Sequence, residues 1–145
     1  MTQLGNRNVV VAIQHQPISI SMYRHLIEDA DVGAHAWFEG VTRRMTGELE
    51  TVRLTYEGFE PMALREMNRI AECIVSEFKL AKLLIAHRLG EVPLGEASLI
   101  VGCSAPHRVN VLLSLAKIVD QLKADVPIWK KEHFANGETQ WVHPK

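Results

Sequence analysis

The sequence contains little of the material that marks several common protein classes. Its 145 residues include only two cysteines, Cys73 and Cys103, which are too few for a disulfide framework and lack the paired spacing of a zinc site. Aromatic residues make up 6% of the chain and the formal net charge is -1, so neither a basic nucleic-acid coat nor an acidic tail is present. No apolar run approaches the roughly 20 residues that span a bilayer, and residues 1–8 lack an apolar signal core. We therefore expect a soluble cytoplasmic protein without a metal site or a membrane segment.

Hydrophobic residues, at 47% of the chain, are enough to build the core of one domain over residues 1–145. Periodicity and turn signals predict strands over 9–13, 34–41, 51–57, 82–88, 97–104, 128–134 and 139–143, and helices over 19–31, 62–80 and 107–125. Pro61 suits a first helical turn, Pro127 ends the last helix, and Asn136-Gly137 predicts a hairpin. The strands come in adjacent pairs, which predicts an α+β fold: a mixed, largely antiparallel sheet with two long helices packed on it. We expect 34–41 and 51–57 to form one hairpin, and 91–96 to be a turn.

The helix over 107–125 carries a lysine in an unusual place. With Leu112 set at zero and 100° added per residue, Lys123 falls at about 20°. It thus lies inside an apolar stripe made of Leu112, Leu115, Ala116, Val119 and Leu122. Either its stem packs while the ammonium reaches water, or the amine is partly desolvated in a cleft and suited to proton transfer or nucleophilic chemistry.

A second lysine follows closely in the strand over 128–134. Paired lysines at 130 and 131 usually mark a solvated edge strand. Strand alternation nevertheless directs only Lys130 to the same side as Ile128, which is the side toward Lys123.

Other basic residues are candidates for binding an anion. His107 and Arg108 open the last helix, where free backbone N–H groups attract negative charge, although exposed basic side chains are the simpler explanation. Arg43 lies in the loop after 34–41, with the same two alternatives. Residues 106–131 hold five Lys or Arg against two Asp, so the balanced total conceals a basic segment. Cys103 lies near His107, but we favour a small core side chain over a nucleophile.

Short segments in a fixed order along most of the chain resemble the MoaE family, the large, catalytic subunits of molybdopterin synthase. The segments are Phe-Glu-Gly-Val-Thr-Arg at 38–43, Leu-Thr-Tyr-Glu at 54–57, Pro-Met-Ala at 61–63, Ala-His-Arg-Leu-Gly at 86–90, Gly-Glu at 95–96, Ser-Ala-Pro-His-Arg at 104–108 and Leu-Lys-Ala-Asp-Val-Pro-Ile-Trp-Lys-Lys-Glu at 122–132. The resemblance divides the chain into a variable N-terminal part, 1–32, and a family core, 33–143. Thr42 stands where the family more often has an aliphatic residue.

The resemblance implies an α/β-hammerhead-like fold and a sulfurtransferase activity. The family converts cyclic pyranopterin monophosphate (precursor Z) into molybdopterin by installing a dithiolene, a step of molybdenum cofactor biosynthesis. The sulfur comes from the C-terminal thiocarboxylate of a small ubiquitin-like, MoaD-like subunit whose tail enters a pocket of the large subunit. The assembly is a heterotetramer around a homodimer of large subunits, and the step needs no metal or other cofactor. The alternative is a non-catalytic docking module for a ubiquitin-like tail; nucleic-acid binding has little support.

The resemblance also assigns residues. Lys123 and Lys130 match the catalytic lysines: Lys123 would lie against the thiocarboxylate as acid/base or charge stabiliser, and Lys130 would orient the tail or substrate and assist proton transfer. Arg43, His107 and Arg108 match the substrate pocket. Arg108 and Lys123 are 15 residues apart on one helix, which is about 22 Å at 1.5 Å per residue. We therefore predict that a dimer mate donates His107 and Arg108 to the pocket of Lys123, Lys130 and Arg43.

Overall fold

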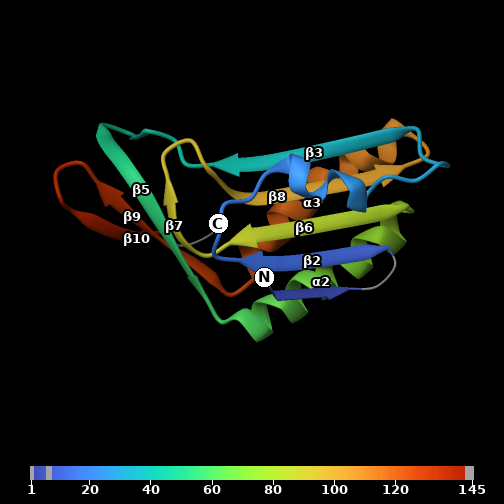
Figure 1. The fold of residues 1–145 in the computed structure, drawn as a ribbon, viewed down its shortest axis with the longest axis horizontal. Coiled ribbons are helices and arrows are strands. Elements are labelled where there is room, and N and C mark those ends of the chain that lie inside the picture. The colour runs from blue at the N-terminus through green and yellow to red at the C-terminus, as the bar shows by residue number, and fades with distance from the viewer. Residues whose placement is uncertain (1, 6–7, 143–145) are drawn as a thin grey trace.

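The computed structural model describes residues 2–5 and 8–142, and Figure 1 shows the arrangement of their helices and strands. The strands are β1 (Thr2–Gly5), β2 (Val9–Gln14), β3 (Ala34–Val41), β4 (Met45–Thr46), β5 (Leu49–Gly58), β6 (Lys82–Arg88), β7 (Gly90–Pro93), β8 (Ala97–Ala105), β9 (Ile128–Phe134) and β10 (Thr139–Val142). The helices are α1 (Ile20–Tyr23), continued by the 3-10 turn η1 (Arg24–Leu26), α2 (Glu60–Phe78) and α3 (Arg108–Asp125). The predicted strand end at residue 143 lies outside the described residues.

The strands form two sheets. The first has the order β1-β2-β6-β8-β3, in which only β2 and β6 run parallel. The second has the order β10-β9-β5-β4, with β7 also paired to β5, and is antiparallel throughout. The predicted α+β fold with a mixed, largely antiparallel sheet is confirmed.

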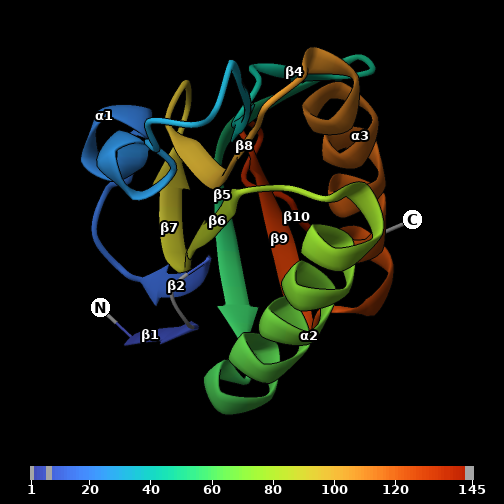
Figure 2. The same cartoon turned by 90° about the vertical axis from the view of Figure 1, so that its right-hand side faces the viewer.

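The two long helices cover one face of the first sheet, while α1 and η1 cover the other (Figure 2). The larger core lies between the sheet and the helices, where Ile74 of α2 and Ile118 of α3 meet Ile85 and Val101 of the sheet. All four side chains are at most 1% exposed. Burying a side chain of this size stabilises the fold by about 1.5–3 kcal/mol, so this layer fixes where both helices lie.

The ends of the long helices follow the predicted signals. Pro61 lies in the first turn of α2, and the helix ends at Lys79, which takes the left-handed conformation with φ 54°. At the end of α3, Val126 is extended and Pro127 follows, as expected for a residue before proline. The hairpin between β9 and β10 turns at Asn136-Gly137, where Gly137 has φ 90°. Among the described residues, no helix is both long and apolar enough to cross a membrane.

The predicted helix over 19–31 is wrong beyond its first two turns. Only α1 and η1 form there, and the Asp31 N–H donates to the Asp29 carboxylate at 2.8 Å instead of to a helical carbonyl. Such local side-chain bonds compete with helix formation. Ile18, Tyr23 and Ile27 are still buried, so the segment packs on the sheet as a compact turn.

The predicted strand pairing in the first half is also wrong. Instead of a hairpin between 34–41 and 51–57, β3 pairs with β8 and β5 pairs with β9. The turn at Gly47 closes a smaller hairpin between β4 and β5. The segment predicted as a turn at 91–96 begins as strand β7, and β1 was not predicted. Adjacent strand signals predict a hairpin, but packing of both strands against distant partners decides the pairing here.

The inner face of α3 differs from the predicted stripe. The helix buries Val111, Ser114, Ile118 and Leu122, whereas Leu112 is 60% exposed. The helix is apolar on two sides, so periodicity alone placed the inward direction about 100° from its true position.

Candidate functional site

A cavity of about 780 Å³ lies between the two sheets and the C-terminal half of α3. Apolar side chains form much of its wall, with Phe38 from β3, Leu54 from β5, Ile85 from β6 and Leu99 from β8 among them. Its charged or hydrogen-bonding lining includes Arg43, Tyr56, His87, Ser98, Asp120, Lys123, Lys130 and Glu132. A deep apolar wall with a few convergent polar groups is typical of small-molecule and peptide-tail sites.

Lys130 enters the cavity from β9. Its partner in the register is Tyr56 on β5, and both side chains line the cavity, as the predicted alternation requires. Burial lowers the pKa of Lys130, and the charges of Lys123 and Arg43 lower it further, while Glu132 acts in the opposite direction. The charges of the three predicted cations therefore interact across the cavity, and the pKa of Lys130 is lowered as a result.

Glu132 is a cavity residue that we did not predict. Its side chain is buried, and its Oε1 accepts hydrogen bonds from the hydroxyls of Thr46 at 2.5 Å and Thr51 at 3.0 Å. The signal was present in the sequence, because the alternation that places Ile128 and Lys130 on one face of β9 also places Glu132 there. A hydrogen-bonded carboxylate beside Lys130 favours the charged ammonium.

Lys123 reaches the cavity from the last turn of α3, where a cation is favoured by the helix dipole. Its side chain is exposed, and no hydrogen bond or ion pair forms between it and the other described residues. Lys117, on the same helix, instead binds Glu77 of α2 at 2.8 Å and stays outside the cavity. Lys123 is thus an exposed ammonium at the cavity and is available to a ligand.

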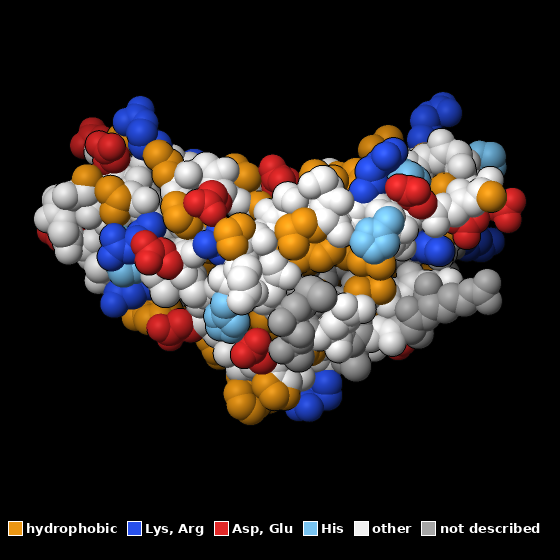
Figure 3. Space-filling model, in the orientation of Figure 1, with side chains coloured by type: hydrophobic (Ala, Val, Ile, Leu, Met, Phe, Trp, Pro, Cys, Tyr) orange, Lys and Arg blue, Asp and Glu red, His pale blue; other side chains and the backbone are white. Residues whose placement is uncertain are grey.

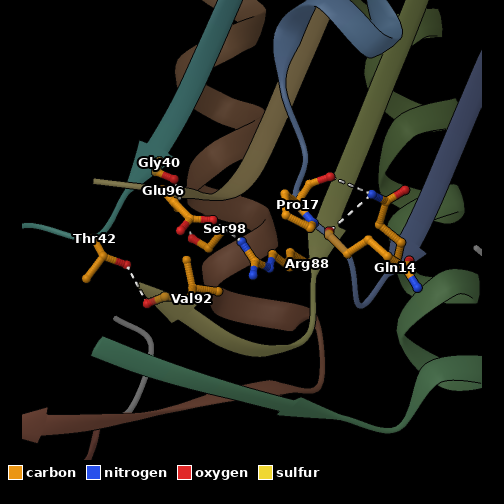
Figure 4. A network of polar contacts seen from close by, with 9 residues as sticks. Gln14, Pro17, Gly40, Thr42, Arg88, Val92, Glu96 and Ser98 are labelled. Atoms are coloured by element: carbon orange, nitrogen blue, oxygen red, sulfur yellow. Dashed lines mark hydrogen bonds and ion pairs between the residues drawn. The ribbon is translucent and has the colours of Figure 1, made fainter. Parts of the chain in front are cut away.

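Arg43 is held at the cavity by the residue before it. The Thr42 N–H donates to the Glu96 carbonyl, the Gly95 N–H donates to the Thr42 carbonyl, and the Thr42 hydroxyl donates to the Val92 carbonyl. The Glu96 carboxylate in turn pairs at 2.8 Å with Arg88, whose side chain is buried (Figure 4). The hydroxyl that departs from the family pattern thus ties the loop carrying Arg43 to β7, and the backbone groups of Thr42 tie it to the turn after β7.

Tyr56 and His87 form part of the cavity wall beside Lys130. Their rings meet edge to face, with centroids 5.0 Å apart and planes at 68°. Burial raises the pKa of Tyr56, an effect that its hydrogen bond with Ser98 partly offsets. Burial lowers the pKa of His87 to about 4. Both residues lie in family segments, but they were not predicted as site residues because nothing local distinguishes them from core aromatics.

His107 and Arg108 lie outside the cavity lining. His107 is the N-cap of α3 and Arg108 is its first residue, and both side chains are exposed. Lys123 lies in the last turn of the same continuous helix. One chain therefore brings Arg43, Lys123 and Lys130 together and leaves the other two predicted residues at the far end of α3.

The cysteines do not belong to this site. Cys103 is fully buried, its thiol donates to the Val111 carbonyl at 3.7 Å, and burial raises its pKa to about 11. These properties agree with the favoured core role and oppose that of a thiolate nucleophile. Cys73 is exposed on α2 and does not line the cavity.

Comparison with known proteins adds to this geometry. The family model described as "MoaE protein" matches residues 13–125. A Dictyostelium discoideum molybdopterin synthase catalytic subunit is 35% identical over 136 residues, covering 92% of this chain and 86% of the relative. A Drosophila willistoni protein of the same name is 41% identical over 131 residues, covering 89% of this chain but 35% of the relative. The chain thus spans about a third of the length of the first curated relatives that it matches.

Solved structures agree with the sequence relatives. The crystal structure of molybdopterin synthase from Staphylococcus aureus superposes with a TM-score of 0.84 at 28% identity, over 90% of this chain and 94% of that one. The match of the family model over residues 13–125 and these full-length similarities give one conclusion: the chain belongs to the MoaE family.

Proposed function

We propose that this chain is the catalytic subunit of a molybdopterin synthase. It transfers sulfur from the C-terminal thiocarboxylate of a small ubiquitin-like subunit to cyclic pyranopterin monophosphate, and so forms the molybdopterin dithiolene. The observation that carries the proposal is the meeting of Arg43, Lys123 and Lys130, from three separate elements, on one cavity of about 780 Å³. Both reactants are anions, and cations fixed in a partly desolvated cavity bind and polarise anions more strongly than they do in water.

The three cations have different tasks in this proposal. Lys123, exposed at the cavity, meets the thiocarboxylate and stabilises the negative charge that shifts during sulfur transfer. Lys130 has a lowered pKa, which brings its proton transfer closer to neutral pH, so it serves as the proton donor and acceptor. Arg43 offers a planar guanidinium, which suits the phosphate.

A second copy of the chain completes the site in this proposal. β3 is the outer strand of the first sheet, so the backbone groups on its far edge are open to pairing. Its start lies beside the start of α3, because the Gly33 N–H donates to the Ala105 carbonyl at 3.1 Å; its end lies two residues before Arg43. Antiparallel pairing of two β3 edges about a two-fold axis would carry the second copy's His107 and Arg108 toward Arg43.

The surface along this edge supports such pairing. Exposed Asp29 and Asp31 precede β3 and exposed Arg43 and Arg44 follow it, so opposite charges would meet when the strands run antiparallel. Figure 3 shows this border hollowed, with both acidic and basic side chains at each of its two ends. Next to Arg108, α3 exposes an apolar surface of Val109, Leu112 and Leu113, at 56%, 60% and 61% exposure, which a second copy would bury.

Both cysteines are free, as is usual in reducing compartments, which supports a cytoplasmic location in this proposal.

The test of the proposed function is reconstitution of the purified chain with thiocarboxylated small subunit and precursor Z, followed by an assay for molybdopterin. We expect product from the wild type, and a loss of roughly 100- to 1,000-fold in Lys123→Ala, the scale seen when one charge-stabilising donor is removed. Lys117→Ala, on the same helix but outside the cavity, is the matched control. Binding of the tail without product would instead identify a docking module, and full activity of Lys123→Ala would remove Lys123 from catalysis.

A further inference from the structure

His87 is a partly buried titratable group that the proposed mechanism does not use. It lies on β6, where alternation places it on the same face as Leu83 and Ile85 of the core between the sheet and the long helices. The side chain is partly exposed, and the space that it lines is the cavity. The question is what its imidazole presents to a ligand there.

The hydrogen bond of one ring nitrogen fixes the role of the other. His87 Nδ1 lies 2.8 Å from the Arg88 carbonyl oxygen, which can only accept, so Nδ1 carries the hydrogen. With a pKa of about 4 the ring is neutral at pH 7 and holds one N–H, which leaves Nε2 as an acceptor. Within the described part of the chain, no hydrogen bond to Nε2 is formed.

The other polar side chains of the lining determine what this acceptor adds to the cavity. Arg43, Lys123 and Lys130 can only donate hydrogen bonds when charged. Glu132 is an acceptor, but its Oε1 is already engaged by the hydroxyls of Thr46 and Thr51. The other acceptors of the lining are the exposed carboxylate of Asp120 and the side-chain oxygens of Tyr56, Ser98 and Gln140, so His87 supplies the one aromatic nitrogen acceptor among the described lining residues. A ligand that carries anionic groups together with N–H groups needs hydrogen-bond acceptors in addition to the cations. The edge-to-face contact with Tyr56 keeps the imidazole in one orientation.

We propose that His87 Nε2 accepts a hydrogen bond from an N–H group of the molecule bound in the cavity, and so selects ligands that carry such a group. This inference rests on the proposed function, which offers two sources of the N–H: the backbone of the inserted C-terminal tail, and the ring of the pterin substrate. A ligand without the N–H would bury the acceptor unpaired, and a site built for a hydrogen bond discriminates strongly against such a ligand.

Two substitutions divide the two functions of the ring. His87→Asn places an amide NH₂ where Nδ1–H was, so it keeps the bond to the Arg88 carbonyl and removes the acceptor in the cavity. His87→Gln carries an oxygen near the position of Nε2 and gives up the bond to the backbone. His25→Asn, an exposed histidine of η1 outside the cavity lining, is the matched control.

The measurements are the Kd of a synthetic peptide of the small subunit's tail, the KM for precursor Z in the reconstituted reaction, and the thermal midpoint of each variant. We expect His87→Asn to keep the wild-type midpoint and to weaken one of the two constants by roughly five- to 100-fold, while His87→Gln changes it less. A weakened tail Kd identifies the tail as the donor, and a raised KM identifies the pterin.

Two results would overturn the proposal. In the first, both constants of a folded His87→Asn variant stay within about twofold of wild type. In the second, both variants lose binding only in proportion to a lowered thermal midpoint, which indicates a purely structural imidazole. A wild type that yields no product refutes the proposed function and this inference with it, whereas an active wild type with an unaffected His87→Asn refutes the inference alone.

Discussion

The division of the site between two copies gives the sharpest test, because it predicts that two inactive variants restore one another. Lys123→Ala removes the lysine of the cavity, and Arg108→Ala removes the cation at the far end of α3. α3 runs unbroken from Arg108 to Asp125, so the 15 residues between the two positions span about 22 Å. A pterin monophosphate is much shorter than this, so one substrate cannot contact both side chains of one chain.

The magnitude follows from the symmetry of a dimer with two sites. Alone, Lys123→Ala loses roughly 100- to 1,000-fold in rate. Arg108→Ala, which loses a charged hydrogen bond to the substrate, loses roughly ten- to 100-fold. When the two are co-expressed in equal amounts, about half of the dimers are mixed, and each mixed dimer has one intact site of two. The mixture should therefore reach about a quarter of wild-type activity, far above either parent.

The assay is formation of molybdopterin from precursor Z with an excess of thiocarboxylated small subunit, at equal total protein. Co-expression of Lys123→Ala with Lys117→Ala calibrates the ratio of the two copies, because about half of all sites then keep Lys123 whichever way the copies combine. Purification of the test mixture through two different tags, one on each variant, verifies that mixed dimers form. Activity of the test mixture no higher than the mean of its parents, with normal dimers and a normal calibration, would refute the shared site. It would mean that Arg108 acts within its own chain or not at all.

Three further predictions concern single groups. Glu132 raises the pKa of Lys130, so Glu132→Gln should lower that pKa further and move the alkaline limb of the pH–rate profile to lower pH; an unmoved limb would separate Lys130 from the rate. The pKa of His87 is about 4 when folded and 6.5 ordinarily, so the unfolded state takes up the proton first and the free energy of unfolding falls by about 3 kcal/mol as the pH is lowered from about 6.5 to about 4. Denaturant titrations should show this loss in wild type and not in His87→Asn. An alkylating reagent should add one label, on Cys73, to the native protein and a second, on Cys103, only after unfolding, as mass spectrometry would count.

The sequence predicted the parts of this fold that are encoded locally. The ends of α2 and α3 follow from Pro61 and Pro127, and the β9–β10 hairpin follows from Asn136-Gly137. The face of Lys130 followed from strand alternation, whereas Lys123 lines the same cavity although the stripe predicted to direct it inward is not the buried face of α3. These signals depend on a few neighbouring residues, so they do not change with the distant partners against which the segment packs.

What could not be predicted depends on distant partners. β3 has the same alternation whether it pairs with β5 or with β8, and only the packed sheet decides between them. The inward face of α3 was misjudged because the helix is apolar on two sides, one facing the core and one exposed at Leu112. Tyr56 and His87 were missed for a related reason, since a cavity exists only once both sheets are assembled around it.

The short connection between α3 and β9 makes the spacing of the two lysines rigid. Lys123 belongs to the last turn of a helix, Lys130 belongs to a strand, and between them the chain turns at Val126 and Pro127, where the Ile128 N–H donates to the Val126 carbonyl. Inserting or deleting one residue after this turn would exchange the two faces of β9. Trp129 or Lys131 would then face the cavity in place of Lys130. The number of residues between the two lysines must therefore stay fixed. An insertion or deletion in this connection would remove one lysine from the cavity.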